Sequence, residues 1–300
     1  GGTEIQFWER RDPLAFGETN IDLEMRFPFV NMHAGLEIVH EDLLNEGYSI
    51  QYNQERSKNF AKKNSADELN RLADILQEKI ETFMDDWKVD LDLKLMRDGS
   101  YDSKAIVGLD GLIPTSATAG FIGGKSRTNP LLQHTVFTGL TTVANGTLYT
   151  QMTRAWRQAN LNGRGRSSRV DFLMAGSDFI MGYLAWRLAN NFSVNANASR
   201  IGSVDIALDE DDAKFKGLQI VYNPTMDYLD TVEPGLAVPW SKRCYGLASK
   251  ALKIVSPSGM WEQFSAPRDP ADQRFTRFSL DTRMGYLNTC PNSHFLVAIA

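Results

Sequence analysis

The sequence has 300 residues, of which 42% are hydrophobic, so the chain can bury a large core and form one to three domains. Its net charge of -5 at pH 7 argues against a dedicated nucleic-acid-binding protein, because neutralising phosphates requires a basic excess. Two cysteines are too few for a disulfide framework, and neither a signal-peptide pattern nor an apolar run of about 18 residues is present.

The first 20 residues place aromatic side chains among charged ones with no helical period. Phe7, Trp8 and Phe16 are too sparse to line a core of their own. We therefore expect an extended arm that lays these rings on another surface.

Residues 21 to 52 contain three short runs in which apolar and polar residues alternate: 21–27, 36–39 and 48–52. Alternation predicts β-strands, here a hairpin with polar side chains on both faces. His33 and His40 are expected to bracket its turn. Because such a hairpin has little core of its own, we expect it either to lie on a partner subunit or to be flexible.

The longest predicted element is a helix over 65–97. Ser65 and Glu68 form a capping box, and Gly99 supplies a stop. Between these signals apolar residues recur at three- and four-residue spacing: Leu69, Leu72, Ala73, Leu76, Ile80, Phe83, Met84, Trp87 and Leu91. Such a helix would be roughly 50 Å long, about the diameter of a compact globule of this chain length, so we expect an elongated or flattened molecule.

A compact α/β unit is predicted after a glycine-rich stretch over 106–130. Apolar spacing predicts, in order, a helix over 147–160, a strand over 170–175, a helix over 177–190, and strands over 204–208 and 218–222. Beyond Pro239 the chain is expected to be mainly β, with strands over 243–247, 251–255, 275–287 and 295–299.

The segment Gly120-Phe-Ile-Gly-Gly-Lys-Ser126 is the strongest hint of a ligand site. A phosphate-binding loop needs a glycine five residues before the glycine of its Gly-Lys pair, and that position is Ala119. Pro130 also disfavours the helix that would have to follow. We therefore interpret the segment as a glycine-rich connector, with a nucleotide site as the less favoured alternative.

No pattern typical of a catalytic or metal site stands out. His134 and His294 stand alone, without Glu-x-x-His, His-x-His or paired-cysteine spacing. The acidic run Asp209–Asp212 fits a solvated hairpin tip better than a calcium loop, and no Gly-x-Ser-x-Gly elbow occurs. The sequence thus predicts no enzyme, no cofactor and no metal.

Arginines gather at one helix end and in the loop after it: Arg154, Arg157, Arg164, Arg166 and Arg169. They could bind a phosphate backbone or the carboxylates of a neighbouring subunit. A solubilising loop is the plain alternative. Because the loop is flanked by glycine, we favour a contact between subunits.

The order of elements resembles the Hong Kong 97-type major capsid protein of tailed double-stranded DNA bacteriophages. An aromatic arm, a two-stranded excursion, one very long helix, a compact α/β block and a β-rich return carry this resemblance. Its most telling strings are Asp98-Gly99, Gly108-Leu-Asp-Gly-Leu-Ile-Pro114, Gly123-Gly-Lys-Ser-Arg-Thr-Asn-Pro130 and Val170-Asp-Phe-Leu-Met-Ala-Gly-Ser177.

The resemblance implies an α+β capsid fold with four parts. Residues 1–21 would be the N-terminal arm, and 22–55 the extended β-hairpin loop that reaches over a neighbouring subunit. Residues 56–118 and 240–300 would form the peripheral domain with its long spine helix, and 119–239 the axial domain. The founding member cross-links a lysine of its extended loop to the next subunit, but residues 22–55 contain no lysine, so non-covalent contacts or a decoration protein would have to hold this shell.

The implied function is that of a structural subunit that assembles into pentamers and hexamers of an icosahedral shell enclosing double-stranded DNA. Portal, scaffold and decoration proteins are possible partners, without any membrane, and the expected location is the virion after assembly in the bacterial host cytoplasm. The candidate contacts between subunits are Phe7, Trp8, Arg26, Glu37, Arg154, Arg157, Arg164 and Arg166.

Two alternatives stay open. An encapsulin-type shell protein of a bacterial nanocompartment would share the fold and bind a cargo peptide on its inner face. A soluble nucleotide-dependent enzyme would use the Gly120–Ser126 loop, and it would lose ATP binding on Lys125→Ala.

Overall fold

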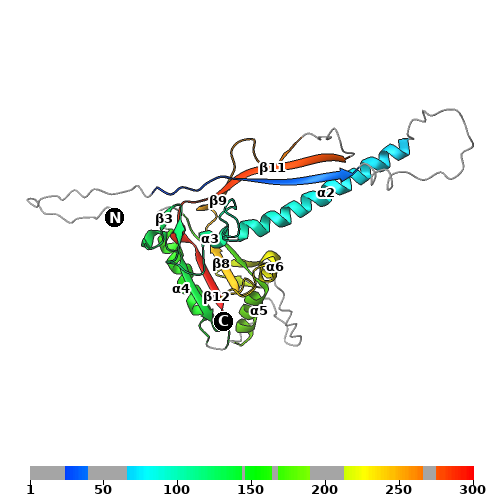
Figure 1. Cartoon of the computed structure of the whole chain (residues 1–300). Helices are drawn as coiled ribbons and strands as arrows, with labels where there is room; N and C mark the ends of the chain where they lie inside the picture. The colour runs from blue at the N-terminus through cyan, green and yellow to red at the C-terminus, as the bar shows by residue number, and fades with distance from the viewer. Residues whose placement is uncertain (1–23, 40–65, 144–145, 164–167, 190–212, 266–274) are drawn as a thin grey trace, which may run out of the picture.

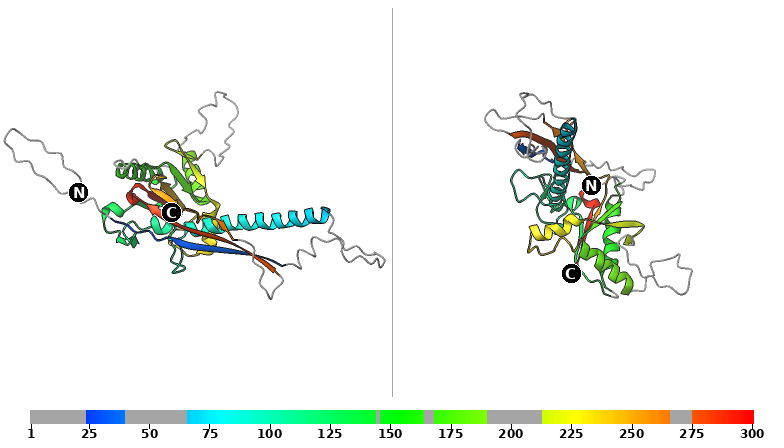
Figure 2. Two further views of the ribbon diagram at one scale, coloured as in Figure 1. Left: turned by 90° about the horizontal axis from the view of Figure 1, so that it is seen from above. Right: turned by 90° about the vertical axis from the view of Figure 1, so that its right-hand side faces the viewer.

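The structure, a computed structural model, describes residues 24–39, 66–143, 146–163, 168–189, 213–265 and 275–300. An elongated part holds the helix α2 (Ala66–Met96) beside the strands β1 (Val30–Val39) and β11 (Phe275–Asn288) (Figure 1). Beneath it lies a body built around a six-stranded sheet. The rod of α2 projects well beyond this body (Figure 2), which confirms the elongated shape expected from the helix length.

The elongated part contains an antiparallel sheet centred on β11. Its strand order is β1-β11-β10, and β9 also pairs with β11; the two short strands are β9 (Leu252–Val255) and β10 (Gln263–Phe264). The predicted strands over 275–287 and 251–255 are thereby confirmed. β10 was not predicted, because two residues are too short to show alternation.

β1 corrects the hairpin expected between residues 21 and 52. One unbroken strand runs from Val30 to Val39 and pairs with β11, with Val30 opposite Met284 and Val39 opposite Phe275. His33 therefore lies inside a strand and not at a turn. Alternation continues through the whole strand, but a partner so distant in sequence leaves no local signal. The expected strand over 48–52 and His40 lie outside the described residues.

α2 confirms the predicted helix almost to the residue, ending at Met96 and not at Arg97. Its 31 residues give a rod of about 46 Å. Gly99 follows in a left-handed conformation, φ +85°, which L-residues with a side chain rarely adopt. Within the described chain no helix could span a membrane, and α2, the longest of them, carries thirteen charged residues.

The apolar stripe of α2 packs on the sheet beside it, as the spacing predicts. Trp87 and Leu95 are buried, and Leu91 packs with Met32 of β1 and Met284 of β11. The ring of Phe83 meets that of Phe264 edge-on, with 6.3 Å between the centroids. The alternation of apolar residues between 89 and 95 does not make a strand, because the helix continues through it.

The body is organised around a six-stranded sheet of order β4-β12-β8-β5-β7-β6. Its strands are β4 (Thr135–Leu140), β5 (Phe172–Ala175), β6 (Lys214–Phe215), β7 (Leu218–Tyr222), β8 (Arg243–Leu247) and β12 (Phe295–Ile299). β12 is parallel to β4, β5 is parallel to β7, and the other pairs are antiparallel. β8 and β12 come from the range 240–300, which the resemblance had assigned to the part containing the long helix.

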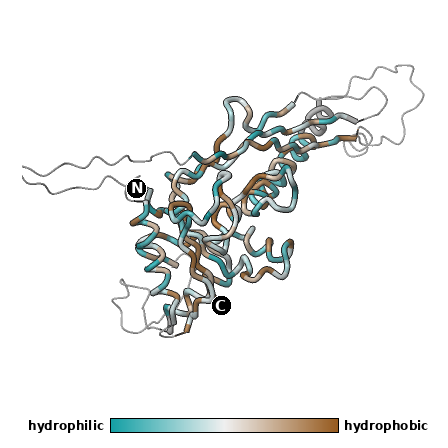
Figure 3. Tube along the Cα trace, turned by 60° about the vertical axis from the view of Figure 1, so that its left-hand side comes forward, coloured by the Kyte–Doolittle hydropathy of each residue, from teal (hydrophilic) through white to brown (hydrophobic). Residues whose placement is uncertain are grey.

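Helices cover both faces of this sheet, and its central strands β8 and β12 are almost entirely buried and largely apolar (Figure 3). On one face α4 (Leu148–Asn162) and α5 (Ser177–Ala189) pack against Leu173, Cys244 and Val297. On the other face α3 (Leu109–Leu112) and α6 (Pro224–Val232) pack against Met174, Tyr245 and Leu296. The two sets alternate along each strand, as the pleat requires.

Helices α4 and α5 and strands β5, β7, β8 and β12 match predicted elements, whereas β4 and α6 were missed. α6 has a local signal that could have revealed it, because Asn223 caps the Thr225 amide and Pro224 occupies the first turn. The short elements are β2 (Phe121–Ile122), β3 (Lys125–Ser126), and the 3-10 turns η1 (Pro130–Leu132) and η4 (Pro291–Ser293). The expected strand over 204–208 lies outside the described residues.

Candidate functional site

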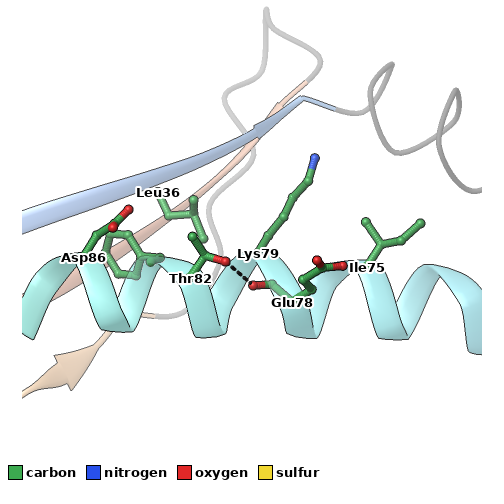
Figure 4. Close-up of a pocket in the computed structure, with 7 residues that line it drawn as sticks. Leu36, Ile75, Glu78, Lys79, Thr82 and Asp86 are labelled. Atoms are coloured by element: carbon green, nitrogen blue, oxygen red, sulfur yellow. Dashed lines mark hydrogen bonds between the residues drawn. The ribbon is translucent and has the colours of Figure 1, made fainter.

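A groove of about 450 Å³ lies between α2 and β1. Its lining is partly apolar and partly charged: Leu36, Ile75, Glu78, Lys79, Thr82, Phe83 and Asp86. Leu36 of β1 approaches the side of the helix that carries Thr82 (Figure 4). The Thr82 hydroxyl donates to the Glu78 carbonyl oxygen at 3.0 Å, so it is already used within the helix. The groove can accommodate an apolar side chain of another chain segment.

α2 carries a large excess of acidic over basic residues. It contains nine acidic and four basic residues, a net charge of -5 that equals the net charge of the whole chain. Asp74, Glu78, Glu81 and Asp85 are all exposed on it. The helix is therefore an acidic rod, and it favours basic partners over nucleic acid.

A second groove, of about 720 Å³, follows the solvent side of α4. Among the described residues, those that line it all belong to that helix: Tyr149, Thr150, Thr153, Arg154, Arg157, Gln158 and Leu161. The Arg154 guanidinium carbon lies 5.8 Å from the centroid of the Phe137 ring, and Arg157 is exposed. Two of the predicted arginines thus share one helix face, as their spacing of three residues requires. Arg164 and Arg166 lie outside the described residues.

Arg26 and Glu37 are exposed, and each has a partner within the chain. Arg26 Nε lies 3.0 Å from Glu24 Oε1, and the Arg26 amide donates to the Gly123 carbonyl oxygen at 3.0 Å. Glu37 Oε2 accepts from Arg277 Nε at 3.2 Å across the β1–β11 pair. The structure does not bring these two residues together with the α4 arginines, and Phe7 and Trp8 lie outside the described residues.

The Gly120–Ser126 segment forms a β-hairpin and not a phosphate-binding loop. β2 pairs with β3, so that Phe121 faces Ser126 and Ile122 faces Lys125. Gly123 and Gly124 form the turn with φ of +55° and +77°, as a two-residue hairpin turn requires. No α-helix follows whose N-terminus could face a phosphate, because the next helical element is the 3-10 turn η1. The connector interpretation agrees with this geometry.

Arg127 and His134 are buried side by side next to the hairpin. Arg127 Nη2 donates to the carbonyl oxygens of Gly111 at 2.8 Å and Leu112 at 2.9 Å, which are otherwise unpaired at the end of α3. Burial lowers the pKa of Arg127 to about 10. His134 Nε2 is 2.7 Å from the Pro114 carbonyl oxygen and therefore donates to it. Both side chains hold the segment around α3, residues 111–114, in place against the six-stranded sheet.

His294 has a similar structural role at the start of β12. Its Nδ1 accepts from the Ala248 amide at 3.2 Å, and its Nε2 lies 3.3 Å from Asn288 Oδ1. Burial lowers the pKa of His134 to about 3 and that of His294 to about 4, so both are neutral at pH 7. In the described part of the chain no three His, Cys, Asp or Glu side chains are grouped so that they could hold a metal ion.

The segment around α3 is fixed to the six-stranded sheet by a buried ion pair that could not be predicted from the sequence. Asp110 of α3 meets Arg243 of β8, with 2.9 Å between Oδ1 and Nη1. The Tyr245 hydroxyl donates to the same carboxylate at 3.2 Å, and Arg243 Nη2 donates to the Val238 carbonyl oxygen at 2.7 Å. Burial raises the pKa of Asp110 above its ordinary value, and Arg243 opposes that shift. Because the Arg243 guanidinium and the Tyr245 hydroxyl are both bound internally, this cluster is structural.

The C-terminal end of α2 is joined to α6 by side chains. Arg97 Nε lies 2.6 Å from Glu233 Oε1, and the Thr225 hydroxyl donates to Asp92. Trp240 is fully buried beneath them, and its indole nitrogen lies 3.4 Å from Glu233 Oε2. These contacts hold the C-terminal end of α2 against the body, whereas its other end points away from the body (Figure 1).

No protein-family model matches this sequence, and no curated protein matches it significantly. Solved structures do match. The capsid of Myoviridae phage XM1 is similar over 91% of this chain and 74% of its own, with 11% identity and a TM-score of 0.51. The capsid of the native GTA particle is similar over 96% of this chain and 81% of its own, with 12% identity and a TM-score of 0.50.

The holo-SrpI encapsulin complex from Synechococcus elongatus PCC 7942 is similar over 90% of this chain and 73% of its own chain, with 8% identity. Its TM-score is 0.44, and we draw no argument from it. The two stronger similarities establish the fold. The chain has the α+β, Hong Kong 97-type capsid fold, which confirms the resemblance based on the order of its elements.

Proposed function

We propose that this chain is a major capsid protein, the structural subunit of an icosahedral bacteriophage shell that encloses double-stranded DNA. The observation that carries the proposal is the similarity of 91% and 96% of the chain to subunits of two capsids. Coverage this complete includes both the elongated part and the body, so it is not the likeness of one common domain.

The shape of the elongated part supports the same proposal. One helix and one sheet make a thin layer (Figure 1), and β1 and β11 expose the polar side chains of His33, Glu37 and Arg277. A layer of this kind buries little core of its own. Burying its edges and grooves against neighbouring copies would add the stability that a single copy lacks.

We propose a division of the chain that follows the sheets. The arm is residues 1–21, the extended loop 22–55, and the peripheral domain 56–118 and 240–300, with the axial domain at 119–239. β8 and β12 pair with strands of 119–239, and we therefore count 243–247 and 295–299 with the axial domain.

The subunit needs no catalysis of its own, no cofactor and no metal. Its partners are copies of itself in pentamers and hexamers, together with portal, scaffold and decoration proteins. It assembles in the cytoplasm of a bacterial host and ends in the virion. Residues 22–55 contain no lysine, so non-covalent contacts or a decoration protein hold the shell together.

Expression of the full chain, sedimentation and negative-stain microscopy test this proposal. We expect capsomers or megadalton shells. A folded monomer at all concentrations would contradict it, and ATP binding that is lost on Lys125→Ala would favour the enzyme alternative. Particles that enclose a protein cargo and no DNA when purified from a host would favour the encapsulin alternative.

A further inference from the structure

The groove on α4 carries cations without acidic partners. Within the described part of the chain neither Arg154 nor Arg157 forms an ion pair, and no carboxylate lines the groove. Both arginines are exposed on the solvent side of α4. Two guanidinium groups on one helix face favour a ligand with several carboxylate or phosphate oxygens.

The chain itself contains a segment of matching charge. Asp209, Glu210, Asp211 and Asp212 follow one another and end at Ala213, which is fully buried. The Ala213 carbonyl oxygen accepts from the Ile220 amide at 2.7 Å, which fixes the point where the acidic run joins the body. That point is next to β6, the edge strand of the six-stranded sheet.

The same edge lies against the beginning of α4. The Phe215 ring is 5.8 Å from the Tyr149 ring, and Lys216 Nζ is 5.7 Å from the centroid of Tyr149. Arg157 is eight residues further along the helix, about 12 Å away. Arg154, five residues beyond Tyr149, is about 8 Å along the same helix. Distance alone therefore does not decide whether the run binds the groove of its own copy or that of another, and the variants below are designed to separate the two.

We propose that the α4 groove binds the acidic run Asp209–Asp212 of a second copy of this chain. This inference rests on the proposed function, because it names the contact that joins neighbours around a symmetry axis. A site and its ligand at different places on one subunit make a head-to-tail interface, and such an interface closes into a ring when its rotation permits. Each Arg154–Arg157 face then receives the acidic run of the preceding subunit.

Charge-reversal variants of the full chain test this contact. R154E/R157E places like charges at the interface, and the concentration for half-maximal ring formation should rise by about a hundredfold. Replacing Asp209–Asp212 with four lysines should have the same effect, and combining both sets in one chain should restore assembly. K250E/K253E is the control, because it makes the same charge change at two exposed lysines outside the groove.

Mixing the two defective variants distinguishes a contact between copies from one within a copy. In a ring where the two variants alternate, each acidic groove of R154E/R157E meets the lysine run of the other variant. Each native groove meets a native acidic run. Equimolar mixing should therefore restore rings with an even number of subunits, such as hexamers, and not pentamers. Rescue by the combined variant without rescue by mixing would show that the run binds the groove of its own copy, and this would overturn the proposal.

The remaining outcomes separate this inference from the proposed function. If the wild type and K250E/K253E form rings and R154E/R157E forms them equally well, the inference alone fails. If R154E/R157E assembles normally but loses affinity for a double-stranded DNA fragment, the groove is a nucleic-acid site and the inference is wrong. If the wild type forms no rings, the proposed function fails and the inference falls with it. Circular dichroism of each variant verifies that it is folded.

Discussion

Arg243 Nη1 lies 2.9 Å from Asp110 Oδ1, and only 2% and 19% of the two side chains are exposed. This pair joins β8, at the centre of the body, to α3, which follows directly from the base of the long helix. The Arg243 guanidinium also lies 4.2 Å from the centroid of the Trp240 ring. Arg243 thus holds together α3, the six-stranded sheet and the segment before β8.

Removing the carboxylate should destabilise the subunit strongly. Asp110→Ala leaves a buried guanidinium without its counter-charge, and breaking a buried pair in this way typically costs about 3–5 kcal/mol. Urea unfolding at fixed protein concentration, followed by tryptophan fluorescence, measures the loss. The matched control is Glu37→Ala, because the Glu37–Arg277 pair is 46% and 58% exposed and should contribute no more than about 1 kcal/mol. Equal losses in both variants would show that Asp110 is not structurally special.

Two glycines of the connector region should respond very differently to alanine. A Cβ at Gly108 would lie 2.3 Å from the Arg97 carbonyl oxygen and 2.4 Å from that of Leu95, and these backbone atoms cannot move aside. Gly108→Ala should therefore cost at least about 3 kcal/mol. A Cβ at Gly120 meets nothing within 4 Å, although φ is +81°. Gly120→Ala should cost only about 1–2 kcal/mol of backbone strain. Thermal unfolding of both variants checks the order, and a more damaging Gly120→Ala would contradict it.

The elements that sequence predicts best here are those whose signals are local. α2 has a capping box, a stripe of apolar residues at helical spacing and a terminal glycine within one continuous stretch, and its bounds were predicted to within a residue. The strand pattern of β11 was equally visible. The partner of β11 was not, because β1 lies near the other end of the chain and alternation does not specify a partner.

The contacts that fix the parts together were invisible for the same reason. Asp110 and Arg243 are separated by 133 positions, and nothing in the sequence distinguishes them from other charged residues. The opposite holds for Arg154 and Arg157, because a spacing of three residues on a predicted helix is enough to place them on one face. The arginine-bearing face of α4 could therefore be predicted from the sequence. The buried Asp110–Arg243 ion pair could be found only from the folded structure.

Acidification should destabilise the fold through two buried histidines. The pKa of His134 is about 3 and that of His294 about 4 in the folded chain, whereas unfolding returns both toward 6.5. Well above pH 6.5 neither state binds a proton, so stability is fully present there. Between about pH 6.5 and 4 the unfolded state binds protons that the folded state excludes, and stability falls by up to about 1.4 kcal/mol per pH unit for each histidine.

Urea midpoints measured between pH 7.5 and 5 test this dependence, because carboxylates titrate mainly below that window. The double variant H134Q/H294Q has no group that titrates at these positions and should lose most of the slope. Its amide groups can still donate to Pro114 and Asn288, so it should remain folded at pH 7.5. An unchanged slope in this variant would assign the acid sensitivity to other groups.

Arg127 provides a way to change the titration of His134 without replacing it. Burial is the main cause of the low pKa of His134, and the positive charge of Arg127 lowers it further. In Arg127→Met that charge is absent, so the folded pKa of His134 moves up toward 6.5 and less stability is lost on acidification.

The same variant leaves the Gly111 and Leu112 carbonyl oxygens unpaired, which should cost about 1–3 kcal/mol at pH 7.5. Arg127→Lys keeps the charge but not the paired geometry, so it should be destabilised and retain the wild-type slope. Urea unfolding of the two variants at pH 7.5 and about pH 3.5 separates charge from hydrogen bonding, because the folded pKa of His134 affects stability only below about pH 5, where the folded state begins to bind the proton. Identical losses of stability on acidification in both variants would show that the guanidinium charge does not act on His134.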